Sequence, residues 1–109
     1  MKDTITSSEE ISDLFRTARK NVSPNLLVLI ATQPEGRDRR GRVAFIAGKR
    51  LGNAPGRNRA KRVMRQAARQ AGLPRDGYDI ALVARTETKD ASSQELAGEL
   101  RRILERTLK

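Results

Sequence analysis

The sequence predicts a single α+β domain, a two-layer sandwich in which helices pack on a β-sheet. Three short apolar runs have the length of strands, and they alternate with segments whose apolar residues recur at helical spacing. The 109 residues suffice for one domain with a modest core, and no linker divides 1–109. The expected order is α-β-β-α-β-α, with room for one more short strand within Gln33–Arg42.

The first helix is expected over residues 8–20. Ser7 and Glu10 have the spacing of a capping box at its start. Apolar residues follow at helical intervals: Ile11, Leu14, Phe15 and Ala18. Residues 21–25 include Ser-Pro and are expected to form a turn.

Two strands are expected next, over 26–31 and 42–47, because both runs are short, apolar and bounded by polar residues. The polar segment 33–41 is expected to join these strands as a hairpin loop.

The stretch from Arg57 to Arg69 carries two patterns at once. On a helix, one face would hold the apolar residues Ala60, Val63, Met64, Ala67, Ala68 and Ala71. The opposite arc would hold five cations and an amide: Asn58, Arg59, Lys61, Arg62, Arg65 and Arg69. An ordinary solvated face mixes charges of both signs, whereas this arc has no acid. The pattern therefore indicates a helix that binds a polyanion.

The segment before this helix, 48–56, holds three glycines and Pro55, which lets its backbone approach a ligand closely. We expect the first N–H groups of the helix to point at whatever lies in front of Gly56 and Arg57, as at phosphate sites.

The last third predicts a strand and a helix. Gly72 and Pro74 end the basic helix, and the apolar run 79–84 follows as a strand. Ser92 and Glu95 form a second capping box. A terminal helix with one apolar stripe then follows: Leu96, Leu100, Ile103, Leu104 and Leu108.

The charge is strongly segregated along the chain. The net charge is +10, and thirteen of the 23 Lys and Arg residues lie within 37–75 beside a single acid, Asp38. A basic segment in a nearly neutral frame indicates a phosphate-binding surface. A membrane is the competing polyanion, but the basic helix has no Trp, Phe or Leu on its apolar face, which disfavours insertion.

The chain has no Cys and no His. This composition excludes disulfides, Cys nucleophiles, Ser-His-Asp triads and zinc sites of the Cys/His type. The N-terminus has no apolar segment of the signal-peptide kind, and the longest apolar run is too short to cross a bilayer, so a cytoplasmic protein is expected.

A longer motif spans the second expected strand and the basic helix. Gly41-Arg42-Val43-Ala44-Phe45-Ile46-Ala47-Gly48-Lys49-Arg50-Leu51-Gly52-Asn53-Ala54 leads into Arg57-Asn58-Arg59-Ala60-Lys61-Arg62. The combination resembles the protein component of bacterial ribonuclease P, contiguously over 42–70 and more weakly over nearly all of the chain.

The resemblance implies a fold like that of the second domain of the fifth small-subunit ribosomal protein, with a left-handed β-α-β crossover. It also implies a role as a subunit of the endonuclease that removes the 5′ leader from precursor tRNA. The catalyst is then the partner RNA, which also binds most of the Mg²⁺. The protein binds the leader, stabilises the active RNA, and has no catalytic side chain, metal site or DNA partner of its own.

The resemblance assigns the basic residues to the catalytic RNA. The expected RNA-binding residues are Lys49, Arg50, Arg57, Asn58, Arg59, Lys61, Arg62, Arg65 and, continuing the row, Arg69. Each cation would neutralise phosphate and release counterions. Asn58 has a second interpretation, as the N-cap of the helix.

In this family the leader lies in a cleft between the first helix and the sheet. An aromatic pair of the family aligns with Ile11 and Phe15, and Leu29 or Ile30 stands where a strand often has Tyr. With few aromatic residues for base stacking, we expect the cleft to depend more on Arg16 and Arg19. The alternative for Phe15 is plain core packing.

Three other functions fit the sequence less well. A structural ribosomal protein would explain the charge but not the motif from Gly41 to Arg62. A DNA-binding helix over 58–69 is disfavoured because 48–56 is too long for the turn of a helix-turn-helix. A nuclease acting alone would need clustered carboxylates to bind a catalytic metal ion. The pair Asp76 and Asp79 is more typical of a turn, in which Asp side chains hydrogen-bond to nearby backbone.

Overall fold

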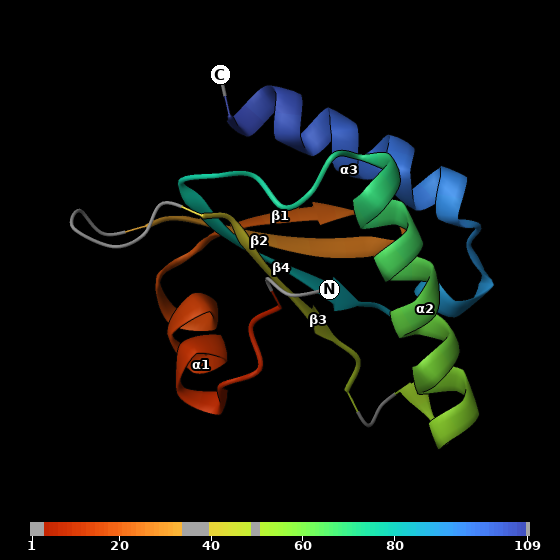
Figure 1. The fold of residues 1–109 in the computed structure, drawn as a ribbon. Coiled ribbons are helices and arrows are strands. Elements are labelled where there is room, and N and C mark those ends of the chain that lie inside the picture. The colour runs from red at the N-terminus through yellow and green to blue at the C-terminus, as the bar shows by residue number, and fades with distance from the viewer. Residues whose placement is uncertain (1–3, 34–39, 49–50, 109) are drawn as a thin grey trace.

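In the computed structural model, the structure describes residues 4–33, 40–48 and 51–108. Four strands form one sheet, with helices on both of its faces (Figure 1). The elements are α1 (Ser8–Thr17), β1 (Arg19–Ser23), β2 (Leu26–Thr32), β3 (Arg42–Ile46), α2 (Ala54–Gln70), β4 (Tyr78–Ala84), the 3₁₀ helix η2 (Thr88–Asp90) and α3 (Ser93–Thr107). The α+β prediction is confirmed.

The sheet has the strand order β1-β2-β4-β3. Strand β2 runs antiparallel to both of its neighbours, and β3 runs parallel to β4, so α2 forms a β-α-β crossover. The expected hairpin across 33–41 is therefore wrong, because β4 lies between β2 and β3. Six of the seven residues of β4 are buried, which explains its central place in the sheet.

The first helix ends at Thr17 rather than at residue 20, and β1 occupies residues 19–23. The turn expected over 21–25 is therefore confirmed only at Pro24 and Asn25. The structure thus has one more strand than the three apolar runs indicated, and this strand precedes β2. The segment in which an additional strand was expected, Gln33–Arg42, includes residues 34–39, which lie outside the described residues. Only one side chain of β1, Asn21, is buried, so the strand lacks an apolar signature.

The two faces of the sheet have separate cores. On one face, side chains such as Val28, Ile80 and Leu82 pack with α2 and α3. The other face is covered by α1 (Figure 1), and there Leu29, Ala81 and neighbours pack with this helix. Five side chains of α2 and six of α3 are buried, but only Leu14 of α1.

The helix ends follow the sequence signals. Ser7 accepts a hydrogen bond from the Glu10 N–H at 3.4 Å, and the full capping box of Ser92 with Glu95 is present. After α2 the chain turns at Gly72, whose φ of +82° is readily adopted only by glycine. The second capping box and the glycine stop are confirmed, whereas the first box is confirmed only for the hydrogen bond to the Ser7 side chain.

Candidate nucleic-acid interface

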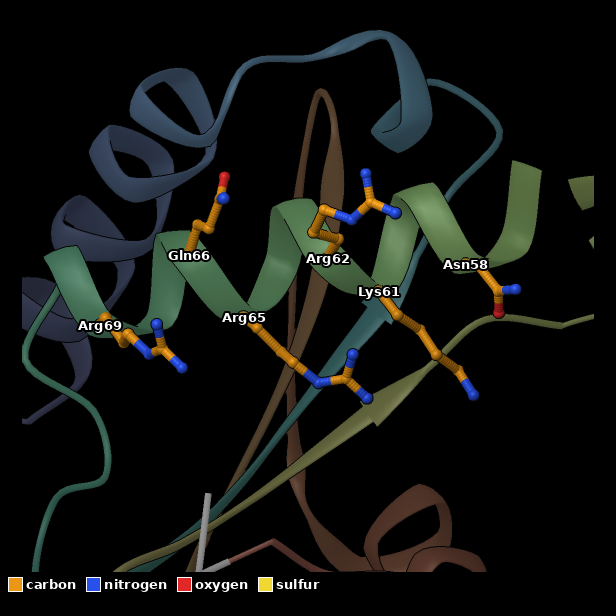
Figure 2. Close-up of a pocket in the computed structure, with 6 residues that line it drawn as sticks. All are labelled: Asn58, Lys61, Arg62, Arg65, Gln66 and Arg69. Carbon is orange, nitrogen blue, oxygen red and sulfur yellow. The ribbon is translucent and has the colours of Figure 1, made fainter. Parts of the chain in front are cut away.

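A groove of about 490 Å³ lies along the outer face of α2 (Figure 2). All the residues that line it belong to this helix: Asn58, Lys61, Arg62, Arg65, Gln66 and Arg69. Four of these six side chains are cations, and the helix has no Asp or Glu. The groove is therefore a surface of one sign, suited to a polyanion.

The opposite face of α2 explains why these side chains point outward. Ala60, Met64 and Ala67 are fully buried in the core that α2 shares with α3 and the sheet. Because their side chains are short, except for Met64, the helix can pack closely on its neighbours. The two-sided helix predicted from the sequence is confirmed.

Arg65 is held in place by an aromatic ring of β3. Its guanidinium carbon lies 5.7 Å from the centre of the Phe45 ring, in a cation–π arrangement. Figure 2 shows Arg65 and Lys61 pointing to one side of the helix, and Arg62 and Gln66 to the other. A ligand in the groove would thus be flanked by cations on both sides.

Arg57 and Arg59 do not line this groove. The Nε of Arg57 donates to the Ala47 carbonyl oxygen at 3.3 Å, and the Nε of Arg59 donates to that of Lys89 at 2.9 Å. Each bond uses one of the five N–H donors of a guanidinium. Both residues therefore also brace the N-terminal half of α2 against the end of β3 and against η2.

Asn58 is not the N-cap of α2. The helix begins at Ala54, and Asn53 caps it, its Oδ1 accepting from the Gly56 N–H at 3.2 Å. The Arg57 N–H donates to the Asn53 carbonyl oxygen. The expectation that these N–H groups face a ligand is therefore wrong, while Asn58 is exposed and lines the groove. Lys49 and Arg50 lie outside the described residues.

The residues predicted for the leader cleft are spread around α1. Ile11 and Leu14 face the sheet, and Leu29 of β2 is fully buried beneath the helix. Phe15 is 36% exposed, so the core-packing interpretation is wrong. On the same sheet face Leu27 and Ile46 are only half-buried. We call Ile11, Phe15, Leu27 and Ile46 the α1-side apolar surface.

A groove of about 330 Å³ lies between α1 and the sheet, on the other flank of the helix. Its lining includes Glu10, Asp13, Arg16 and Arg42, but neither Ile11 nor Phe15. Arg16 is paired with Asp13 there.

Arg19 is on the wrong face of the sheet for a leader site next to α1. It is paired in register with Ile30, whose side chain belongs to the α2–α3 core. Lys20 is paired with Leu29, so it shares the α1 face and is exposed. The sequence pattern predicts a helix through residues 19 and 20, where alternation between faces does not apply, and so Lys20 is not among the residues expected at the cleft.

Asp76 and Asp79 have structural partners. Asp76 Oδ1 accepts from the Gly41 N–H at 2.9 Å, and Asp79 forms an ion pair with Arg42 at 2.9 Å. Within the described residues, no group of three or more His, Cys, Asp or Glu could hold a metal ion. None of the described helices is long and apolar enough to cross a membrane.

Known proteins of one family match this chain. A model of the family described as Ribonuclease P matches residues 1–108. The ribonuclease P protein component of Dehalococcoides mccartyi strain CBDB1 is 32% identical over 100 residues, which cover 92% of this chain and 80% of that protein. That of Gluconacetobacter diazotrophicus is 38% identical over 90 residues, covering 79% and 74%.

Solved structures agree in fold. The ribonuclease P protein of Staphylococcus aureus has a TM-score of 0.77 at 21% identity, covering 94% of this chain and 93% of that one. The Thermotoga maritima protein has a TM-score of 0.75 at 20% identity, covering 94% and 96%. The match of the family model over residues 1–108, together with these relatives, shows that the chain belongs to the ribonuclease P protein family.

Proposed function

We propose that this chain works within ribonuclease P by placing α2 against the catalytic RNA and the α1-side apolar surface against the 5′ leader of precursor tRNA. The family forms the protein subunit of the endoribonuclease that matures tRNA 5′ ends, with RNA as the catalyst. The observation that carries the assignment of α2 is its groove of four cations without an acid.

The α2 groove would bind RNA through phosphate neutralisation and counterion release. Arginine adds planar, bidentate hydrogen bonding to phosphate, which suits Arg62, Arg65 and Arg69 in particular. Lys49 and Arg50 precede this helix in the sequence and would add charge to the same interface. Arg57 and Arg59 would contribute the donors that their backbone hydrogen bonds leave over.

For the leader, the proposal depends on exposed apolar side chains. Single-stranded RNA binds by stacking bases on aromatic faces in addition to charge, and Phe15 offers such a face. Lys20 would supply a cation on the same sheet face. We further propose that the partner RNA holds most of the Mg²⁺ and that the complex works in the cytoplasm.

The test is reconstitution. Purified protein, the catalytic RNA of ribonuclease P and a 5′-extended precursor tRNA are combined at low Mg²⁺ and moderate salt, and cleavage at the mature 5′ end is measured. Stimulation by the protein, with no cleavage by protein alone, supports the proposal. No stimulation across a range of salt and Mg²⁺ would overturn it in favour of a structural ribosomal role.

Phe15→Ala separates the two surfaces in the same assay. It should reduce the preference for precursor over mature tRNA, while affinity for the catalytic RNA stays unchanged because α2 lies across the sheet. An unchanged preference would remove Phe15 from the leader surface.

A further inference from the structure

Helix α1 has the smallest buried contact of the three α-helices described. It spans ten residues and buries one side chain, Leu14, where α2 buries five and α3 six. Short helices are marginal on their own and depend on packing for their stability. Half-buried Ile11 adds to this packing, and polar contacts with the sheet can add further to the stability of the docked helix.

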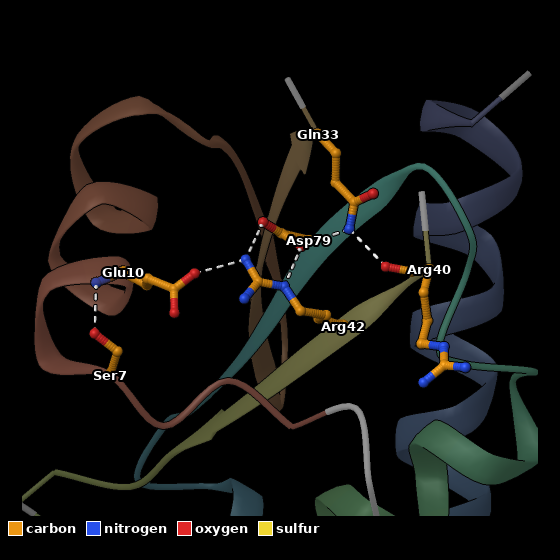
Figure 3. Close-up of polar contacts among 6 residues, drawn as sticks. All are labelled: Ser7, Glu10, Gln33, Arg40, Arg42 and Asp79. Carbon is orange, nitrogen blue, oxygen red and sulfur yellow. Dashed lines mark hydrogen bonds and ion pairs between the residues drawn. The ribbon is translucent and has the colours of Figure 1, made fainter. Parts of the chain in front are cut away.

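One such contact is an ion pair between α1 and β3 (Figure 3). Arg42 Nη2 lies 2.7 Å from Glu10 Oε2. The Arg42 side chain is 25% exposed and that of Glu10 36%, so the pair is partly shielded from water and salt.

Asp79 of the neighbouring strand β4 fixes the Arg42 side chain on the sheet. Its Nε donates to Asp79 Oδ1 at 3.1 Å and its Nη2 to Asp79 Oδ2 at 2.9 Å, a two-point contact that fixes the guanidinium plane. Asp79 Oδ1 also accepts from Gln33 Nε2 at 3.0 Å, and Gln33 Nε2 donates to the Arg40 carbonyl oxygen. The hydrogen bond with Asp79, then Glu10, raises the pKa of Arg42, which stays charged.

Glu10 and Phe15 lie on opposite flanks of α1. Five residues correspond to roughly 140° around a helix, and the sheet-facing Leu14 lies between their directions. Any rocking of α1 that separates Glu10 from Arg42 therefore moves Phe15 relative to the sheet.

We propose that the Glu10–Arg42 ion pair docks α1 on the sheet and thereby positions the α1-side apolar surface for the leader. This inference rests on the proposed function and names Glu10 as a positioning residue. When α1 is docked in only a fraction of the molecules, the apparent affinity for leader falls by that fraction. Affinity for the catalytic RNA does not fall, because α2 packs on the other sheet face.

The test compares Glu10→Ala with Glu9→Ala in the reconstituted enzyme. Both variants remove one carboxylate from the first turn of α1, so they change net charge, helix propensity and helix-dipole interactions alike. Glu9 is exposed, and Arg42 keeps Asp79 as a partner in either variant. Two quantities are measured for each variant. One is the ratio of the affinities for precursor and mature tRNA, and the other is the rate of amide hydrogen exchange in α1.

For Glu10→Ala we expect the precursor preference to fall by up to about fivefold, the full strength of a partly exposed ion pair. Amides of α1 should exchange faster, with those of α2 and α3 unchanged. Glu10→Gln keeps an acceptor for Arg42 and should lie between the wild type and Glu10→Ala. Glu9→Ala should behave as the wild type.

Equal preference in Glu10→Ala and Glu9→Ala would overturn the inference, as would faster α1 exchange without loss of preference. Failure of the proposed function looks different, because the wild-type protein itself would then not stimulate cleavage. A general loss of folding in Glu10→Ala would appear as faster exchange in all helices, and Glu10→Gln would then decide the outcome.

Discussion

Gly41 lies where two backbone segments nearly touch. A Cβ at this position would lie 2.3 Å from the Arg75 carbonyl oxygen, and the Gly41 N–H already donates to Asp76. Because backbone must move to admit a methyl group, we expect Gly41→Ala to lower the free energy of unfolding by about 1–3 kcal/mol. Urea denaturation measures the loss.

Gly48→Ala is the matched control for that substitution. A Cβ there would meet nothing within 4 Å, so its stability should stay close to that of the wild type. Equal stability of the two variants would show that the Gly41–Arg75 approach relaxes at little cost.

At the scale of elements, Glu99 joins α3 to the turn between β1 and β2. Its carboxylate is buried and accepts from the Asn25 N–H at 3.0 Å and from Asn25 Nδ2 at 2.7 Å. Burial disfavours the charged form, but hydrogen bonds from Ser23 and Asn25 and the charge of Arg102 outweigh it, so the pKa of Glu99 is lowered.

A lowered pKa in the folded state stabilises the fold above the unfolded pKa, and the contribution is lost as pH falls through the folded value. We expect Glu99→Gln to cost about 1–3 kcal/mol at pH 7. The difference from the wild type should shrink as pH falls below the ordinary value of 4.5. Denaturation at several pH values tests this, with the exposed Glu105→Gln as control. A difference independent of pH would contradict it.

The elements that the sequence did not reveal are those decided by partners distant in the chain. Strand β1 contains one apolar residue, Val22, and that residue is 67% exposed, so no local pattern marks it. It exists because β2 offers a free edge to pair with. The placement of Arg19 failed for the same reason, since a strand alternates faces where a helix does not.

At the scale of the whole molecule, the excess of positive charge lies in the segment 37–75, which contains α2, and salt should therefore weaken RNA binding steeply. Arg62 lines the α2 groove and is exposed. Arg62→Ala should lower the slope of log affinity for the catalytic RNA against log salt by about 0.7–0.9, one phosphate contact.

Arg106→Ala removes the same charge from the exposed face of α3 and should leave the slope unchanged. Filter binding between low and moderate salt measures both. Equal slopes for the two variants would mean that Arg62 makes no phosphate contact.

The cationic face of α2 could be predicted from the sequence because the apolar residues of this helix recur at helical spacing. Burial of that apolar face on the core turns the cations on the opposite face toward solvent. The strand order could not, since the turn signals at 33–41 say nothing about β4 entering between β2 and β3. The pairing of Arg16 with Asp13 could have been expected from their i,i+3 spacing on the helix, but the groove that both residues line depends on how α1 packs against the sheet.

Strand β3 contributes side chains to both of the proposed RNA-binding faces. Phe45 points to the α2 side and supports Arg65, while the next residue, Ile46, points to the α1 side. The two proposed RNA contacts, with the catalytic RNA at α2 and with the leader at the α1-side apolar surface, thus lie on opposite faces of one sheet. One residue inserted between Phe45 and Ile46 would move the Ile46 side chain, at the end of β3, from the α1 side to the α2 side of the sheet. The alternation of side chains along one short strand therefore decides which of the two proposed RNA-binding faces each residue serves.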